Sequence, residues 1–213
     1  MTGAEFTQTR RSLHGLAELL MAGPQFRRSG TVRLRVIPGG FATTKEPDIM
    51  VKELRLLAGG RTLPLAGSYA DLAHTAGITP GAPSDLYPQG CDIAIEDTIA
   101  IDPQSAGRIT DGLALGLRAL GRFAPHQTAV LWPEHFDAGA STPVAGGVNV
   151  GAAAPDGFCS EPYLYVGPWT DARPGGGGYW NAPFGAYVPR SQVDGVDAAV
   201  AFLAEGLRRL TAG

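Results

Sequence analysis

Apolar residues recur at helical spacing near the start of the chain, where Thr7 or Thr9 can cap a helix and Gly23-Pro24 should end it. The same spacing returns twice. One stretch begins at Asp102-Pro103 and should reach about Arg122, and a last helix follows Asp194. The apolar positions of the three stretches are Leu13, Leu16, Ala17, Leu20 and Met21; Ala106, Ile109, Leu113, Leu117 and Leu120; and Val196, Val200, Leu203, Leu207 and Leu210.

A different pattern, strict alternation, marks the segment 31–37, in which Val32, Leu34 and Val36 fall on one face and Arg33 and Arg35 on the other. This segment is predicted to be a strand with one wet side. The segments 49–57 and 61–65 predict a hairpin closed at Gly59-Gly60. Further strands are expected within 93–101, 128–132, 147–152 and 161–169, and loops over 79–90 and 170–178.

A short helix is expected where Ser68 and Asp71 have the spacing of a capping box and Gly77 can end the helix. Strands interleaved with helices in this order predict the α+β class, a mostly antiparallel sheet or sheets with amphipathic helices packed on one face. We expect one compact unit over 1–213, with a sub-boundary near 123–127 between a helix-strand-helix half and a half rich in glycine and aromatic residues.

Composition is that of an ordinary globular protein, with 44% hydrophobic and 17% charged residues among 213. Cys91 and Cys159 stand apart and belong to no CxxC or Cys/His cluster, which argues against a zinc ribbon or a disulfide scaffold. Neither a secretion signal nor a membrane span is expected, and the cytoplasm is the predicted location. The run Gly175 to Gly178 suggests a hinge or lid, because no GK[ST] follows it.

Positive charge is concentrated near the start of the chain. Six arginines, against Glu5 and Glu18, lie in the first 35 residues; they are Arg10, Arg11, Arg27, Arg28, Arg33 and Arg35. Such a segment is either a solvated basic face or an anion-binding surface. Because arginine is the habitual cation throughout the chain, the solvated face is the preferred interpretation, and a nucleic-acid partner is not favoured.

Side chains suited to chemistry are densest in Trp132-Pro-Glu-His-Phe-Asp137 and in the two aromatic segments 161–169 and 179–184. If 132–137 is extended, His135 and Asp137 point to the same face and resemble an acid/base pair or half of a metal site, which Glu161 can complete. The alternative is that His135 only braces a turn. The candidate catalytic residues are His135, Asp137 and Glu161, and the candidate ligand-binding residues are Trp132, Glu134, Tyr163, Tyr165, Trp169, Trp180 and Asn181.

With WPEHFD followed by EPYLYV, the segment 128–206 resembles a mainly actinobacterial family defined as a domain of unknown function, which has a W-x-x-HFD motif before EPYxYV. The resemblance implies that Trp132, His135, Asp137, Glu161 and Tyr163 belong to the family pattern, without giving them roles. The first half, from RRSLHGLAELL to GGFATT, resembles actinobacterial proteins labelled maleylpyruvate-isomerase-like. That label implies a helical bundle with a three-histidine metal site, which the chain lacks, so the activity is not carried over.

The residues leave three hypotheses of function. The first is a small-molecule-binding protein or enzyme, with an aromatic-lined pocket anchored by His135, Asp137 and Glu161. The second is a divalent-metal enzyme that uses the same residues. The third is a non-catalytic homodimer that pairs through exposed aromatic side chains. No P-loop, GxGxxG, HExxH or GxSxG motif supports a nucleotide, zinc-protease or serine-hydrolase function, and the sequence identifies no cofactor.

Overall fold

The computed structural model describes residues 3–83, 85–87, 90–171, 173–175 and 178–212. These residues form two compact units. Unit 1 comprises residues 1–111 and 131–136, and unit 2 comprises residues 112–130 and 137–213. The predicted sub-boundary at 123–127 lies inside unit 2. The long helix α4 (Pro103–Phe123) begins in unit 1 and continues into unit 2.

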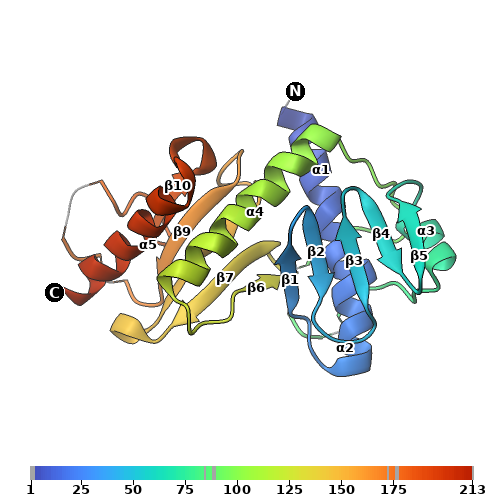
Figure 1. Ribbon diagram of the computed structural model, residues 1–213, viewed down its shortest axis with the longest axis horizontal. Helices are drawn as coiled ribbons and strands as arrows, with labels where there is room; N and C mark the ends of the chain where they lie inside the picture. Colours follow the sequence, from blue (N-terminus) through green and yellow to red (C-terminus); the bar gives the residue numbers. More distant parts are fainter. Residues whose placement is uncertain (1–2, 84, 88–89, 172, 176–177, 213) are drawn as a thin grey trace. The chain divides into compact units, whose positions relative to one another are not determined.

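The sheet of unit 1 is antiparallel, with strand order β6-β1-β2-β3-β4-β5 (Figure 1). The alternation over 31–37 is confirmed: Val32, Leu34 and Val36 are buried, while Arg33 and Arg35 are exposed. The predicted hairpin contains one more turn than expected, because residues 53 and 54 adopt positive φ and divide 49–57 into two strands. The strands are β1 (Leu34–Ile37), β2 (Gly40–Thr43), β3 (Ile49–Lys52), β4 (Arg55–Ala58), β5 (Arg61–Pro64) and β6 (Val130–Trp132).

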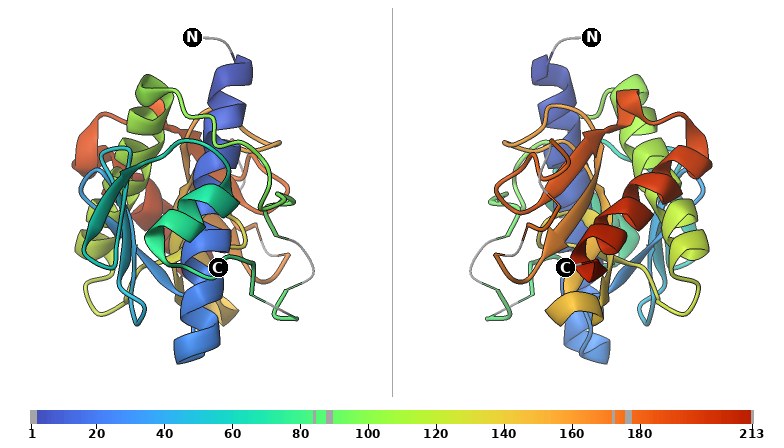
Figure 2. Two further views of the ribbon diagram at one scale, coloured as in Figure 1. Left: turned by 90° about the vertical axis from the view of Figure 1, so that its right-hand side faces the viewer. Right: turned by 90° about the vertical axis from the view of Figure 1, so that its left-hand side faces the viewer.

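One continuous helical rod packs on this sheet, as the left view of Figure 2 shows. It consists of α1 (Gly3–Gly15), the π-helical segment η1 (Leu16–Ala22) and α2 (Gly23–Ser29). Every residue of η1 is buried. The expected end at Gly23-Pro24 is wrong: Pro24 lies in the first turn of α2, where a missing N–H costs little, and the rod ends at Gly30 in the left-handed conformation.

The capping box of α3 (Tyr69–Ala76) is confirmed, with Ser68 and Asp71 bonded reciprocally and Gly77 in the left-handed conformation. The strand expected within 93–101 is wrong. Apart from a single bridge at Thr98, the described backbone of this segment forms no ladder. Its polar groups instead bond the helical rod and α3: Ser12 Oγ donates to Ala100 O at 2.9 Å, and Ala70 N donates to Ile95 O at 2.8 Å.

In unit 2 a four-stranded antiparallel sheet, β10-β9-β8-β7, carries α5 (Gly195–Thr211) and the later part of α4 on one face (Figure 2, right). Its core joins Leu115 and Ala119 of α4 and Leu203 of α5 to Val150 and Val166 of the sheet. The other elements are β7 (Asp137–Thr142), η2 (Val144–Gly146), β8 (Val148–Ala153), β9 (Tyr163–Pro168), β10 (Ala186–Pro189) and η3 (Arg190–Gln192).

Both units are built from antiparallel strands and helices, so the predicted α+β class is confirmed. Neither β7 nor β10 was expected from the sequence. The run Gly175 to Gly178 lies partly outside the described residues. None of the described helices is both long enough and apolar enough to span a bilayer.

Candidate functional site

The segment 133–136 is a turn, so the extended conformation of 132–137 that would place His135 and Asp137 on one face is not adopted. Phe136 has φ of 54°, its N–H donates to Trp132 O at 2.9 Å, and its side chain is fully buried. The ring packs edge-on against Phe41 and stacked on His14, with centroids 5.4 and 5.7 Å away. The shared face expected of His135 and Asp137 therefore does not form by strand alternation: His135 belongs to the turn in unit 1, and Asp137 begins β7 in unit 2.

This turn is fixed to α1 through two backbone carbonyls. Pro133 O accepts from His14 Nε2 at 2.5 Å, and His135 O accepts from Arg10 at 3.3 Å. The side chain of His135 is 68% exposed and lies 3.9 Å from the Glu134 carboxylate. The turn thus presents Glu134 and His135 outward, while Phe136 anchors it.

The surroundings of His14 strongly favour its uncharged form. Burial, and then the positive charge of Arg10, lower its pKa to about 3. The ring is therefore neutral at physiological pH, and since Nε2 donates to a carbonyl, Nδ1 carries the lone pair. Nδ1 is buried and meets no hydrogen-bond partner among the described residues.

One turn further along the rod, Glu18 is 1% exposed and lies within the π-helical segment. Its Oε1 accepts from the Tyr87 hydroxyl at 3.0 Å, and its Oε2 accepts from the Cys91 N–H. Gly90 packs so closely on this carboxylate that a Cβ there would collide with it. Burial and Glu18 together raise the pKa values of the Tyr87 phenol and the Cys91 thiol. Both groups therefore keep their protons, and the carboxylate has the donors it needs inside the protein.

Tyr87 also lines a cavity of about 420 Å³ in unit 1. Trp132 at the end of β6 and Glu134 of the turn form another part of its wall, together with Arg33, whose guanidinium lies 5.7 Å from the centre of the Trp132 ring. Trp132 and the lining residue Leu86 are 37% and 45% exposed, so the cavity opens to solvent. The cavity combines aromatic and apolar walls with one cation and one carboxylate, the composition typical of small-molecule sites.

In unit 2 three of the predicted residues come together on the sheet face opposite the helices. Tyr165 donates its hydroxyl to Asp137, and its ring lies over Gly139 and Gly151, where any Cβ would collide with it. Tyr163 donates to Asp156 Oδ2 at 2.7 Å, with its ring centroid 6.5 Å from that of Tyr165. Burial first, and then the neighbouring carboxylates, raise the pKa values of both phenols. The pairs Tyr165–Asp137 and Tyr163–Asp156 are therefore part of the close packing on this face of the sheet.

The other predicted residues of unit 2 lie at separate places. Glu161 accepts from the hydroxyl and the N–H of Ser191 at 2.8 and 3.0 Å and so links the segment before β9 to η3. Trp169, 62% exposed, donates to Asn149 at 2.9 Å. Trp180 donates to Pro174 O at 2.9 Å, and Asn181 bonds both polar backbone groups of Tyr187. Each of these contacts joins a loop to its surroundings.

Sequence reasoning found Trp132 and Glu134 but missed His14, Glu18, Arg33 and Tyr87. A signal was present for Glu18, which interrupts an otherwise apolar run, Leu16 to Ala22. For the metal hypothesis, the described residues contain no group of three or more histidine, cysteine or acidic side chains able to hold an ion. Cys91 and Cys159 are free and partly buried.

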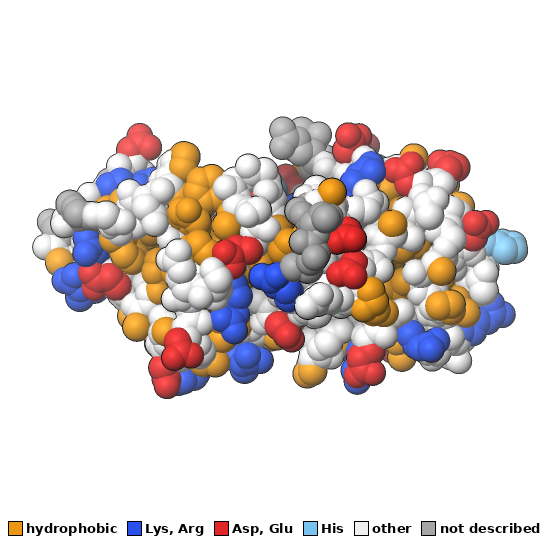
Figure 3. Space-filling model, turned by 90° about the horizontal axis from the view of Figure 1, so that it is seen from above, with side chains coloured by type: hydrophobic (Ala, Val, Ile, Leu, Met, Phe, Trp, Pro, Cys, Tyr) orange, Lys and Arg blue, Asp and Glu red, His pale blue; other side chains and the backbone are white. Residues whose placement is uncertain are grey.

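The six arginines near the start of the chain mainly fasten segments together. Arg11 donates to Asp92 O and pairs with Asp97, Arg27 donates to Thr79 O, and Arg35 donates to Thr43 O. On the face seen in Figure 3, basic and acidic side chains of the described residues are interspersed. The interpretation of the arginine-rich start of the chain as a solvated face stays a prediction.

Comparisons of the chain with family models, curated proteins and solved structures give no match. The two family resemblances therefore stay predictions.

Proposed function

We propose that this chain is a small-molecule-binding protein and that its ligand occupies the cavity beside Trp132 in unit 1. The observation that carries the proposal is the cavity itself, whose wall joins the Trp132 ring, the Arg33 guanidinium and the Glu134 carboxylate. Its volume of about 420 Å³ lies within the range of ligand sites. The ligand that fits has a planar apolar body, to lie against the indole, and a polar group at one end.

The site is supported from behind. Tyr87 is oriented by a buried carboxylate, and the turn that follows Trp132 and carries Glu134 is fastened to α1 by His14 and by the buried Phe136. Side chains fixed in this way lose little entropy when a ligand binds, which favours affinity. In this proposal the polar groups that anchor the ligand are Glu134 and Arg33, and not His135, Asp137 and Glu161 as expected from the sequence.

Titration with aromatic fragments, followed by ¹⁵N–¹H spectra, tests the proposal. Trp169 is an internal control, because its ring is more exposed than that of Trp132 and a nonspecific aromatic ligand should reach it first. We expect a binding fragment to shift the Trp132 indole resonance and leave that of Trp169 in place. Trp132→Ala should weaken binding about tenfold or more, as loss of an aromatic anchor usually does, and Trp169→Ala should not. Fragments that shift Trp169 alone, or equal affinities of the two variants, would contradict the proposal.

A further inference from the structure

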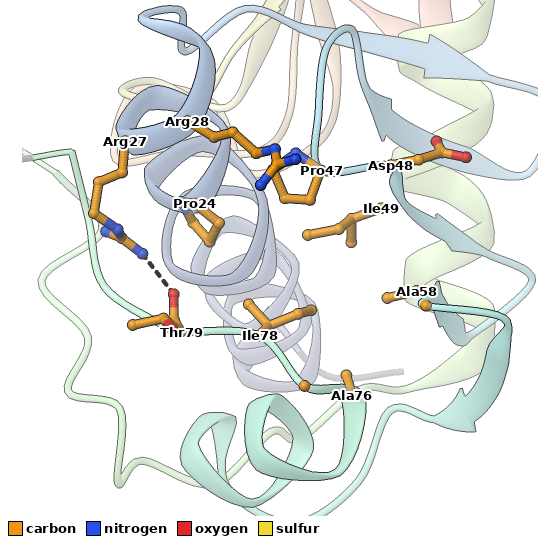
Figure 4. A pocket seen from close by; sticks show the side chains of 12 residues that line it. Pro24, Arg27, Arg28, Pro47, Asp48, Ile49, Ala58, Ala76, Ile78 and Thr79 are labelled. Atoms are coloured by element: carbon orange, nitrogen blue, oxygen red, sulfur yellow. Dashed lines mark hydrogen bonds between the residues drawn. The ribbon is translucent and has the colours of Figure 1, made fainter.

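A second cavity of unit 1, of about 550 Å³, lies between α2 and the two segments 47–49 and 76–79 (Figure 4). It shares no lining residue with the cavity beside Trp132. Its floor is apolar and is lined by the buried Pro24, Ile49 and Ala58 and the partly exposed Ile78. It is therefore a separate site, and a ligand bound there is independent of the proposed function.

The charge at this cavity comes from α2. Of the six early arginines, Arg28 is the one for which the described part of the chain offers no hydrogen bond, ion pair or ring contact, whereas Arg27 is occupied by Thr79 O and Gly81 O. Figure 4 shows the Arg28 side chain reaching over the cavity toward Pro47, and the carboxylate of Asp48 directed away from it. A guanidinium above an apolar floor is thus left available.

The walls are held in place before any ligand arrives. Arg27 ties the segment 79–81 to α2, and Ser29 Oγ donates to Glu46 O at 2.7 Å, which ties the loop before Pro47 to the same helix. Gly23 of α2 packs so closely on Gly81 that a Cβ there would collide with the Gly81 carbonyl. A cavity fixed on both sides needs little reorganisation to accept a ligand.

We propose that this cavity binds a small molecule with an apolar body and one carboxylate, the carboxylate paired with Arg28 and the body lying on Ile49 and Ile78. One free guanidinium matches one carboxylate in charge and can bind it through two parallel hydrogen bonds. The apolar floor favours a hydrocarbon chain over a compact polar anion such as inorganic phosphate. Anion binding by the arginine-rich start of the chain is thereby assigned to a single residue, Arg28.

The test uses the whole chain and two probes of equal length, octanoate and octanol, with binding read from isoleucine methyl shifts in ¹³C–¹H spectra. We expect octanoate to shift the methyl resonances of Ile49 and Ile78, and octanol to bind about tenfold more weakly. Arg28→Gln should weaken octanoate binding about tenfold, the loss of one charge-assisted contact, and leave octanol unaffected. Arg55→Gln, a change at an exposed arginine of the same unit, should alter neither affinity.

Three results would overturn the proposal. They are no shift of Ile49 and Ile78 at millimolar octanoate, equal affinity for octanoate and octanol, and equal octanoate affinity in Arg28→Gln and Arg55→Gln. Arg28 is exposed, so its replacement should leave the fold intact. Inorganic phosphate added as a third probe should compete weakly or not at all, and strong competition would count against the apolar carboxylate as the ligand class.

Discussion

In each unit a carboxylate accepts a hydrogen bond from a tyrosine hydroxyl. Glu18 accepts from Tyr87 in unit 1, and Asp137 accepts from Tyr165 in unit 2. In unit 2 the hydroxyl end of the tyrosine lies against two glycines of the sheet, and the pair is part of the packing. In unit 1 the tyrosine is also a wall of a cavity that opens to solvent beside Trp132. The same type of contact, a carboxylate with a tyrosine hydroxyl, thus contributes to packing in unit 2 and, in our proposal, supports a binding site in unit 1.

Among the substitutions that test this comparison, replacement of Glu18 should cause the largest loss of stability. Glu18→Ala leaves the Tyr87 hydroxyl and the Cys91 N–H without their acceptor inside the protein, and each such loss costs about 1–3 kcal/mol. We expect the free energy of unfolding in urea to fall by about 3 kcal/mol. Glu96→Ala, at an exposed glutamate of the same unit, should change it by less than about 0.5 kcal/mol. Equal effects of the two variants would show that the buried carboxylate contributes no stability.

A methyl group added under the Tyr165 ring tests how closely unit 2 is packed. In Gly151→Ala the new Cβ would lie 2.5 Å from Ala138 O and 2.7 Å from the Tyr165 hydroxyl oxygen. Because one neighbour is backbone, we expect a loss of about 2 kcal/mol in urea unfolding. Gly157→Ala meets open space and is the matched control. If Gly151→Ala proves as stable as Gly157→Ala, this face of the sheet is not closely packed.

The buried imidazole of unit 1 predicts a pH dependence. The pKa of His14 is about 3 in the folded protein, against an ordinary value of 6.5, so between these values the unfolded chain binds a proton that the folded chain does not. Stability should therefore fall as pH falls from 6.5 toward 3, by up to about 1.4 kcal/mol per pH unit from this residue.

Urea unfolding at several pH values checks this slope. His14→Gln should reduce it, and His135→Gln, at a mostly exposed histidine, should leave it unchanged. A slope that survives in His14→Gln would mean that other groups cause the acid sensitivity.

Removal of the two tyrosine hydroxyls should cause the smallest losses of stability, and the two losses should differ. Tyr165→Phe removes a donor from a carboxylate whose Oδ1 is also buried, and should cost about 1.5 kcal/mol. Tyr87→Phe should cost about 1 kcal/mol or less, because Glu18 keeps the Cys91 N–H. Both are measured by urea unfolding. A larger loss for Tyr87→Phe would reverse the contrast between the two pairs.

Local patterns predicted the local structure well. The capping box at Ser68, the alternation over 31–37 and the long stripe from Ala106 are each determined by residues close in sequence, and each is present. The alternation over 93–101 was misleading, because an extended segment packed on helices alternates in burial just as a strand does. β7, with the sequence DAGAST, has no branched apolar alternation, and its small residues suit the Tyr165 ring that covers it.

The sequence predicted only part of the candidate site, because residues that contact one another there are far apart along the chain. Trp132 and Glu134 carry recognisable chemistry in one short motif. The residues that support them come from elsewhere: His14 meets Pro133 across 119 positions, and Tyr87 meets Glu18 across 69. The π-helical segment that holds Glu18 could not be predicted, because at this length its apolar spacing is the same as that of an α-helix.

In our proposal the cavity beside Trp132 is a binding site. A crystal of the whole chain soaked with the aromatic fragment that most shifts the Trp132 indole resonance tests this directly. We predict fragment density against the Trp132 ring and within contact distance of Tyr87 and Glu134. Density found only at the exposed ring of Trp169, or against Tyr165 in unit 2, would contradict it.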